Sequence, residues 1–351
     1  MIDSKTRVLQ SNINPIKQHH VQWNNTYDIK QQENRINSLL DKLKLVPEIN
    51  PEKFFLLTRG YKHRYFAVCI DENKQKVIFN CLVRYDKLSI QSYQKELRFA
   101  QLINNPHFPH KDYLPTYLQV SQSPQELWFI QKYISYAILE NKENMGQLAF
   151  PIKTQQIKNI ANTMYDINTR LLKESYPKLT MHKFDIDNKI TEIFQIILPS
   201  LKIKGFINES SIKVVERFIY SCATLVKRSN YYFVHGDFNL GNIFLSTSQN
   251  IKIIDWETYH QNNHCYDIAY LYSRLFREPA FRKKVVSEFF QLIPEDKKEG
   301  SKILFRFNIL HLTLSYINYG LFIELTKKDF QLQRKWFIDL AKNNASKFSL
   351  I

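Results

Sequence analysis

Hydrophobic positions along the chain change their spacing from strand-like runs in the first third to helical stripes in the remainder. Short β-branched and aromatic runs at residues 53–58, 64–70 and 76–85 are separated by polar turns, and they predict a three-stranded meander. A further run at residues 126–134 predicts the last strand of this part of the chain.

Apolar residues at helical spacing begin before that last strand and dominate after it. Residues 89–103 carry Tyr93, Leu97 and Ala100 on one stripe, which predicts a helix between the meander and the last strand. Similar stripes predict helices at residues 36–43, 154–174, 212–226, 266–276, 280–292, 301–325 and 330–342. The pattern indicates an α+β protein with two lobes, a small β-rich one at residues 32–134 and a larger helical one at residues 135–351. The polar residues 1–31 are predicted to be a mobile arm.

Composition supports a large folded unit inside the cell. The chain has 351 residues, of which 44% are hydrophobic, enough to bury sizeable cores. Its four cysteines form no close pair, so neither a disulfide framework nor a zinc cluster is expected, and we predict them to be reduced and buried. The start lacks the apolar segment of a signal peptide, and the long apolar region at residues 303–325 is interrupted by Arg306 and His311. We therefore expect a cytoplasmic protein without a membrane span.

The net charge of +16 raises the alternative of a nucleic-acid binder. Basic residues are spread along the whole chain, however, and no block of them dominates. We therefore expect no specific nucleic-acid partner, and the alternative predicts strongly salt-dependent binding to oligonucleotides.

Two motifs carry candidate chemistry for handling phosphate groups. They read His235-Gly-Asp237-Phe-Asn-Leu-Gly-Asn242 and Ile253-Ile-Asp255-Trp-Glu257. Transfer of a phosphate group requires a hard cation on oxygen ligands and a carboxylate that orients the attacking hydroxyl. Asp237 suits the second task. Asn242 and Asp255 suit the binding of Mg²⁺. Asn242 lies beyond a tight turn that we attribute to a glycine at position 241, and Asp255 lies at the end of a predicted strand.

The two motifs resemble the catalytic segment of the aminoglycoside phosphotransferase and choline kinase superfamily, which is related to protein kinases. Members carry His-Gly-Asp, four residues and Asn, then Ile-Asp-Trp/Phe-Glu, and the likeness continues here at Asp267-Ile-Ala. The resemblance implies a two-lobed kinase-like fold and a transferase that uses ATP and Mg²⁺. It also implies an acceptor hydroxyl on a small molecule, bound along the helices of the second lobe.

Further site residues follow from this resemblance. Asp237 would be the catalytic base, and His235 would brace the loop that carries it. Asp267 is predicted to cap the next helix. Glu257 has three open interpretations: it holds the metal region, faces the acceptor, or is only a solvated acid.

On the nucleotide side the chain departs from the family pattern. Arg84 stands where the third strand of the family carries a phosphate-reaching lysine, and Glu96 of the following helix is its candidate partner. Arginine is bulkier and binds carboxylate or phosphate in a planar fork, so the exchange is not neutral. Lys87 is the alternative cation. Leu82 would touch the adenine, and the turn around Gly60 is either a phosphate-covering loop or an ordinary hairpin.

The segment that joins the lobes would bind the adenine through its main chain, from Gln131 to Tyr133.

Three functional classes follow. The leading one is a small-molecule kinase acting on a sugar, an amino alcohol such as choline, or a related metabolite, with an aromatic cage in the choline case. The second is a nucleotide-binding pseudokinase that acts as a scaffold, because of Arg84 and the sparse glycines. The third is the nucleic-acid binder.

Overall fold

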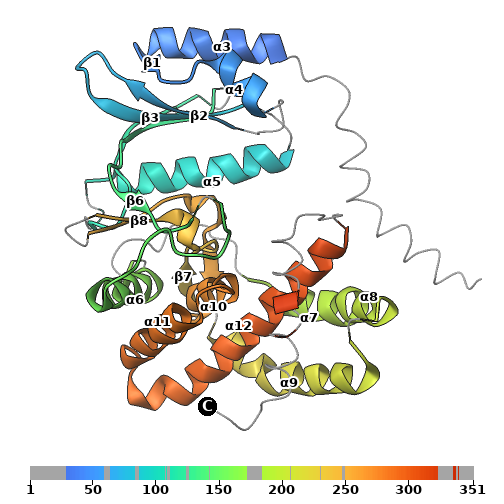
Figure 1. Cartoon of the computed structure of the whole chain (residues 1–351). Helices are drawn as coiled ribbons and strands as arrows, with labels where there is room; N and C mark the ends of the chain where they lie inside the picture. Colours follow the sequence, from blue (N-terminus) through green and yellow to red (C-terminus); the bar gives the residue numbers. More distant parts are fainter. Residues whose placement is uncertain are drawn as a thin grey trace, which may run out of the picture. The chain divides into compact units, whose positions relative to one another are not determined.

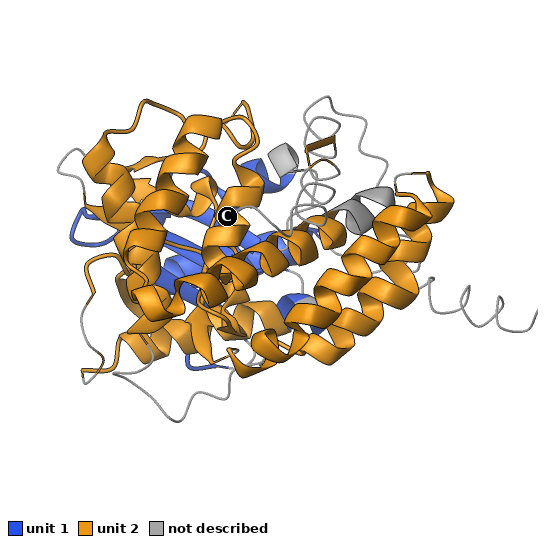
Figure 2. Cartoon of the chain, turned by 90° about the horizontal axis from the view of Figure 1, so that it is seen from below, with its two compact units in different colours: residues 1–90, 121–130 blue, residues 91–120, 131–351 orange. Residues whose placement is uncertain are grey.

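Two units make up the computed structural model of the chain, one of residues 1–90 and 121–130 and the other of residues 91–120 and 131–351 (Figure 2). The structure describes residues 29–58, 64–83, 87–106, 108, 111–123, 126–141, 143–171, 184–205, 207–229, 231–246, 250–322, 335–336 and 339. The predicted arm lies outside these residues except for its last positions, which belong to the first helix. The predicted helix at residues 330–342 also lies almost wholly outside them. The lobe boundary at residue 134 stays a prediction.

The first unit is built on an antiparallel hairpin. Strand β2 (Arg64–Ile70) pairs with β3 (Lys76–Leu82), and the register sets Tyr65 opposite Cys81. In the sheet order, β1 (Val46–Pro47) precedes β2, and β5 (Trp128–Lys132) follows β3. Burial alternates along β2, where Tyr65 is fully buried and Phe66 is half-exposed, as expected for a strand with one covered face. The predicted strands at residues 64–70, 76–85 and 126–134 are thereby confirmed; the first has the predicted bounds, and the other two are shorter.

Two helices cover the buried face of this hairpin (Figure 1). Helix α3 (Ile29–Lys42) contributes Ile36 and Leu40 to the core, and α4 (Pro51–Thr58) contributes Phe55. The prediction of a strand at residues 53–58 was therefore wrong. Asn50 accepts a hydrogen bond from the Lys53 amide over 2.9 Å, and Pro51 occupies the first helical position, so this segment begins as a capped helix.

The second unit is mainly helical, as predicted. Figure 1 shows α12 running beside α10 and α9, and α11 packing against α6. The helices are α5 (Lys87–Ile103), which starts in the first unit, α6 (Thr154–Thr169), α7 (Ile186–Glu192), α8 (Leu198–Ile203), α9 (Glu209–Arg228), α10 (Tyr266–Arg274), α11 (Pro279–Gln291) and α12 (Glu295–Phe322). A π-helical turn, η2 (Ile193–Ile197), joins α7 to α8. No helix in the described ranges is both long and apolar enough to cross a membrane.

Short strand pairs of the second unit hold the segments that carry the two motifs. β7 (Tyr232–Val234) pairs with β10 (His260–Asn262), and β8 (Ile243–Leu245) lies between β6 (Ala137–Ile138) and β9 (Ile251–Ile253). The remaining strand is β4 (Tyr117–Val120), which the sequence did not predict. Beneath these pairs the buried ring of Trp256 stacks on Phe99, with ring centres 4.3 Å apart. This aromatic packing fixes the chain directly after Asp255.

All four cysteines are free and buried, as predicted. Burial raises the pKa of the Cys69, Cys81 and Cys222 thiols to about 12, so these thiols stay protonated near neutral pH. These cysteines have no disulfide partner and no thiolate character, so they behave as apolar core residues.

Candidate active site

The loop between β7 and β8 makes a sharp turn that requires glycine at position 236. Gly236 has a φ of +86°, and a Cβ there would come within 2.4 Å of the Thr258 carbonyl oxygen. Gly241, to which we attributed the turn, is not in the left-handed region; its amide instead donates to Asn239 Oδ1 over 2.7 Å inside a 3₁₀ turn, η3 (Leu240–Asn242). The sequence interpretation thus chose the wrong glycine of the two.

Asp237 follows this turn, and its carboxylate is held by three donors. Asn239 Nδ2 donates to Oδ1 over 2.9 Å, Asn242 Nδ2 donates to Oδ2 over 3.0 Å, and the Tyr270 hydroxyl donates to Oδ1 over 2.5 Å. The residue remains partly exposed. A carboxylate fixed on three sides and open to solvent can orient a hydroxyl group and accept its proton.

Asn242 and Asp255 are brought together by the β8–β9 pairing. Ile243 lies opposite Ile253, and the Ile254 amide donates to the Asn242 carbonyl oxygen over 3.1 Å, so Asp255 follows directly at the same end of the hairpin. Asp255 adopts left-handed backbone angles of +64° and +62°, a region where aspartate is over-represented among non-glycine residues.

The donor set at this end of the hairpin fits a magnesium ion. Both hydrogens of the Asn242 amide nitrogen face acceptors of Asp237, so its side-chain oxygen is the atom left to act as a ligand. With the Asp255 carboxylate it makes a pair of hard oxygen ligands, and Mg²⁺ is usually held by one or two carboxylates together with substrate phosphates and water. In the described part of the chain, no group of three or more His, Cys, Asp or Glu side chains is placed to hold a metal.

His235 is a fully buried brace for the loop. Its Nε2 donates to the Ile254 carbonyl oxygen over 2.9 Å, and its Nδ1 accepts from the Asp237 amide over 3.2 Å. These partners define the neutral tautomer with the hydrogen on Nε2. Burial lowers the pKa of His235, which favours the same neutral form. The side chain therefore links the two motifs and has no free proton to exchange.

Asp267 anchors the loop that carries Asp237 by accepting hydrogen bonds from the backbone amides of that loop. Its carboxylate is fully buried and accepts from the amides of His235 and Gly236 over 2.9 and 3.0 Å and from Asn168 Nδ2 over 2.7 Å. The prediction that Asp267 is the helix cap was wrong. α10 begins at Tyr266 after Cys265, and Asp267 turns to the loop from the first helical turn.

Glu257 lies in the 3₁₀ turn η4 (Trp256–Thr258) and accepts from the Ser92 hydroxyl of α5 over 2.5 Å. It is only partly exposed, so it is not merely a solvated acid. Burial lowers the pKa of the neighbouring Lys95 ammonium, and the Glu257 charge offsets part of that shift. The contact ties the segment after Asp255 to α5.

Sequence reasoning missed a cluster that supports Asp237 from behind. The Tyr270 hydroxyl accepts from the Tyr316 hydroxyl over 2.6 Å and from the Arg274 guanidinium over 3.1 Å, and Arg274 also donates to Tyr316. Burial raises the pKa of Tyr270 far above its usual value, so its proton stays available to Asp237. The spacing of Asp267, Tyr270 and Arg274 along one helical face was a usable signal. Tyr316 lies on α12, and no signal in the sequence linked it to this cluster.

Of the residues predicted on the nucleotide side, Gly60 and Arg84 lie outside the described residues. Glu96 lies on α5 and is buried, and Lys87 at the start of that helix is exposed. The Arg84–Glu96 pair therefore stays a prediction.

Leu82 closes β3 and is fully buried. Its amide donates to the Leu127 carbonyl oxygen over 2.9 Å, and its own carbonyl accepts from Arg35 over 2.5 Å. Gln131 is buried, and Tyr133, after the end of β5, has 37% of its surface exposed. A role of these residues in holding an adenine ring stays a prediction. Trp128 belongs to the core of the first unit.

Sequence comparison finds proteins that are similar to this chain. Over residues 213–292 the chain matches the sequence model described as the Phosphotransferase enzyme family. It is also 21% identical over 271 residues to an uncharacterized protein of Metamycoplasma hominis, covering 74% of this chain and 48% of that protein. The chain thus spans about half the length of this curated relative.

Solved structures extend the likeness to most of the chain. A thermostable mutant of aminoglycoside phosphotransferase APH(4)-Ia, in a ternary complex with ADP and hygromycin B, superposes with a TM-score of 0.56 at 11% identity, covering 90% of this chain and 99% of that one. Choline kinase LicA from Streptococcus pneumoniae gives a TM-score of 0.53 at 13% identity, covering 91% of this chain and 100% of that one. The chain therefore has the protein-kinase-like fold of the aminoglycoside phosphotransferases and choline/ethanolamine kinases that its motifs resemble.

Proposed function

We propose that the chain is a small-molecule kinase that transfers the terminal phosphate of ATP to a hydroxyl group. The observation that carries this proposal is the arrangement around Asp237. Its carboxylate is held by Asn239, Asn242 and Tyr270, and Asn242 shares one end of the β8–β9 hairpin with Asp255. A base directed at an acceptor and two oxygen ligands for a cation are the parts that phosphoryl transfer requires.

In this mechanism Asp237 receives the acceptor hydroxyl and takes its proton while the acceptor oxygen bonds to the terminal phosphorus and the bond from that phosphorus to the bridging oxygen breaks, which releases ADP. Asn242 and Asp255 would hold Mg²⁺, which neutralises charge on the phosphate oxygens when it is bound. His235 and Asp267 fix the loop backbone, so Asp237 keeps its direction while the hydroxyl approaches.

The acceptor is a small molecule that bears a hydroxyl group, such as a sugar, an amino alcohol or a related metabolite. One solved neighbour is described in a complex with hygromycin B and another as a choline kinase, at 11% and 13% identity to this chain. A nucleotide-binding scaffold without transfer activity remains the competing proposal, because position 84 carries arginine in place of lysine.

A screen with radiolabelled ATP, Mg²⁺ and a panel of sugars, polyols, choline and ethanolamine tests the proposal. We expect a labelled product with at least one acceptor and none with Asp237→Asn, which removes the base with little change of shape. The mutant should still bind ATP, as seen in a thermal shift. ATP binding by the wild-type chain with no product from any acceptor would favour the scaffold. Full activity of Asp237→Asn would refute the assigned base.

A further inference from the structure

Arg274, on α10, is a cation whose partners in the described part of the chain are hydroxyl groups and aromatic rings. Its guanidinium donates to Tyr270 over 3.1 Å and to Tyr316, and it lies 3.9 Å from the centre of the Tyr316 ring. Burial alone would lower the pKa of Arg274, but the neighbouring Tyr270, Tyr316 and Asp237 raise it overall, so the side chain stays charged. Charges that are withdrawn from water are usually paired with an opposite charge. A guanidinium that instead donates to hydroxyl groups points to a role for its charge in this cluster.

The hydrogen bonds of this cluster all run in one direction, from Arg274 to Asp237. A guanidinium can only donate, so the hydroxyl oxygens of Tyr270 and Tyr316 both accept from Arg274. A carboxylate can only accept, so Tyr270 uses its single hydrogen to donate to Asp237 over 2.5 Å. The 2.6 Å contact between the two hydroxyl groups is therefore a donation by Tyr316 to Tyr270. The two charged ends leave each hydroxyl group one orientation.

This order links the charge of Arg274 to the direction of the Asp237 carboxylate. A hydroxyl group that accepts a hydrogen bond becomes a stronger donor, and a charged donor has a larger effect on it than a neutral one. Tyr270 accepts from two donors, Arg274 and Tyr316, and its one hydrogen passes their effect to Asp237. Without the Arg274 charge the same hydroxyl group would hold Asp237 less firmly. Arg274 can therefore act on Asp237 through Tyr270.

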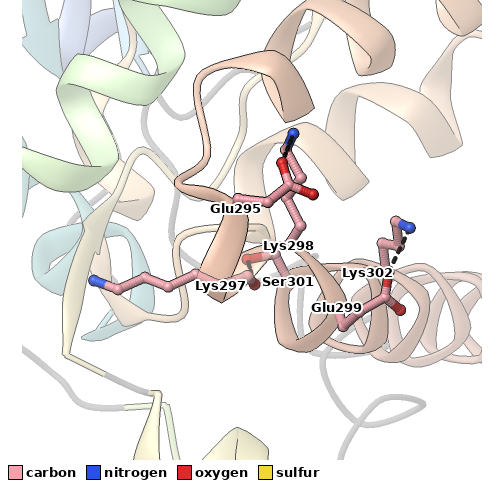
Figure 3. Close-up of polar contacts among 6 residues, drawn as sticks. All are labelled: Glu295, Lys297, Lys298, Glu299, Ser301 and Lys302. Carbon is pink, nitrogen blue, oxygen red and sulfur yellow. Dashed lines mark hydrogen bonds and ion pairs between the residues drawn. The ribbon is translucent and has the colours of Figure 1, made fainter.

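Tyr316 reaches this cluster because α12 is fixed against the segment before α10. Ser301, Asn308 and Tyr316 follow one another at seven and eight residues, so they lie on one side of α12. Asn308 and Asn263 exchange two amide hydrogen bonds, of 2.7 and 3.2 Å, and the Ser301 hydroxyl lies 2.8 Å from Nε2 of His264. Figure 3 shows Ser301 in the first turns of α12, where two ion pairs form within the helix, Glu295 with Lys298 and Glu299 with Lys302. The contacts to the segment before α10 are buried and polar, and they set which side of α12 faces α10.

We propose that Arg274 is a positioning residue for the proposed kinase reaction, whose charge orients the Asp237 carboxylate through the hydroxyl groups of Tyr270 and Tyr316. The inference rests on the proposed function, since Asp237 has an acceptor hydroxyl to meet only if phosphate is transferred. The competing explanation is that the cluster only packs α10 against α12. The two explanations differ in the effect of removing the charge once Tyr270 has already lost its hydroxyl group.

Three variants separate the charge of Arg274 from its bulk and from the support of the helix end. Arg274→Met removes the charge and keeps a long apolar side chain, whereas Arg274→Lys keeps a cation that can donate to both hydroxyl groups. Arg282→Met is the matched control. Arg282 also lies against an aromatic ring, 4.1 Å from the centre of that of Trp336, and it donates to the Leu275 carbonyl oxygen directly after α10. Within the described residues it forms no hydrogen bond or ring contact with Tyr270.

Steady-state kinetics of the full chain, with the acceptor identified by the screen, test the proposal. We expect Arg274→Met to lower kcat about fivefold and to change KM for ATP by less than about twofold, because a hydrogen bond to the base is weakened but not removed. Arg274→Lys should keep kcat within about twofold of wild type, and Arg282→Met should leave it unchanged.

A double variant with Tyr270→Phe decides whether Arg274 acts through that hydroxyl group. Tyr270→Phe alone should lower kcat about tenfold, and adding Arg274→Met should lower it by less than about twofold more, because the connecting hydroxyl group is gone. Two independent structural roles would instead multiply to a loss of about fiftyfold.

Tyr316→Phe gives a second measurement if Arg274→Met fails to fold. It keeps the ring on which Arg274 lies and removes only the hydroxyl group, so it should lower kcat about threefold alone and not at all beside Tyr270→Phe. With an active wild type, three results would each overturn the proposal: an unchanged kcat in Arg274→Met, an equal loss in Arg282→Met, or losses that multiply in the double variants. A wild type that transfers phosphate to no acceptor would overturn it together with the proposed function.

Discussion

Tyr270→Phe tests whether the cluster behind Asp237 positions it for catalysis. The substitution keeps the ring and removes the hydroxyl that donates to Asp237 Oδ1. A hydrogen bond to a charged group contributes about 1.5–3 kcal/mol, which corresponds to roughly 10- to 150-fold in rate if it is lost in the transition state. Asp237 keeps two other donors, Asn239 and Asn242, so we expect the lower end, about a tenfold fall in kcat.

A second effect acts in the opposite direction but is smaller. A carboxylate that loses a donor becomes a stronger base, which alone would raise the rate. Phosphoryl transfer through a loose transition state needs little proton removal, however, and depends mainly on position and charge. The loss of orientation should therefore outweigh the gain in basicity.

Steady-state kinetics with the acceptor identified by the screen give the measurement. We expect kcat to fall while KM for ATP changes by less than about twofold, because the Tyr270 hydroxyl donates to the proposed base. Tyr220→Phe, at an exposed tyrosine of α9, is the matched control and should leave both constants unchanged. A wild-type kcat in Tyr270→Phe, or a loss confined to KM for ATP, would refute the positioning role.

Three further predictions concern the metal, the nucleotide side and pH. Asp255→Ala should lose the thermal shift that wild type shows with ATP and Mg²⁺ together, and an unchanged shift would place the metal elsewhere. Arg84→Ala and Glu96→Ala should each lower turnover, with the double variant no worse than the stronger single one; additive losses would show that the pair is absent. Because the folded pKa of His264, about 4, lies below the ordinary 6.5, the unfolded chain binds more protons on acidification. Lowering the pH from 7 to 5 should therefore reduce the free energy of unfolding by about 2 kcal/mol through this residue. Urea titrations at the two pH values should find a smaller reduction in His264→Gln.

The sequence predicted those parts of the site that depend on short-range pairing. Asp237 and Asn242 meet within the turn before β8, which the spacing of the first motif implies, and the β8–β9 pairing brings Asn242 to the same end as Asp255. The sequence analysis missed Gly236 because the group that excludes a side chain there is the Thr258 carbonyl. That carbonyl belongs to a segment more than twenty residues further along the chain.

Elements that depend on long-range packing were missed or misread. Tyr316 joins the cluster only because α12 packs against α10, and nothing in the local pattern of either helix records that contact. At residues 53–58 the apolar run fits a strand or a buried helix equally well, since four consecutive apolar residues have no distinguishing period. The decisive signal there was Asn50 followed by Pro51, a helix start that outweighs the composition of the run.

The cluster behind Asp237 also bears on which acceptors suit the site. The Arg274 guanidinium lies 3.9 Å from the centre of the Tyr316 ring, so this aromatic face already carries a cation. A quaternary amine placed about 6 Å from that charge would be repelled by roughly 3 kcal/mol at an effective dielectric constant of about 20, more than a cation–π contact returns. The Tyr316 ring is therefore not expected to serve as part of an aromatic cage for a choline-like acceptor, because Arg274 already occupies its face.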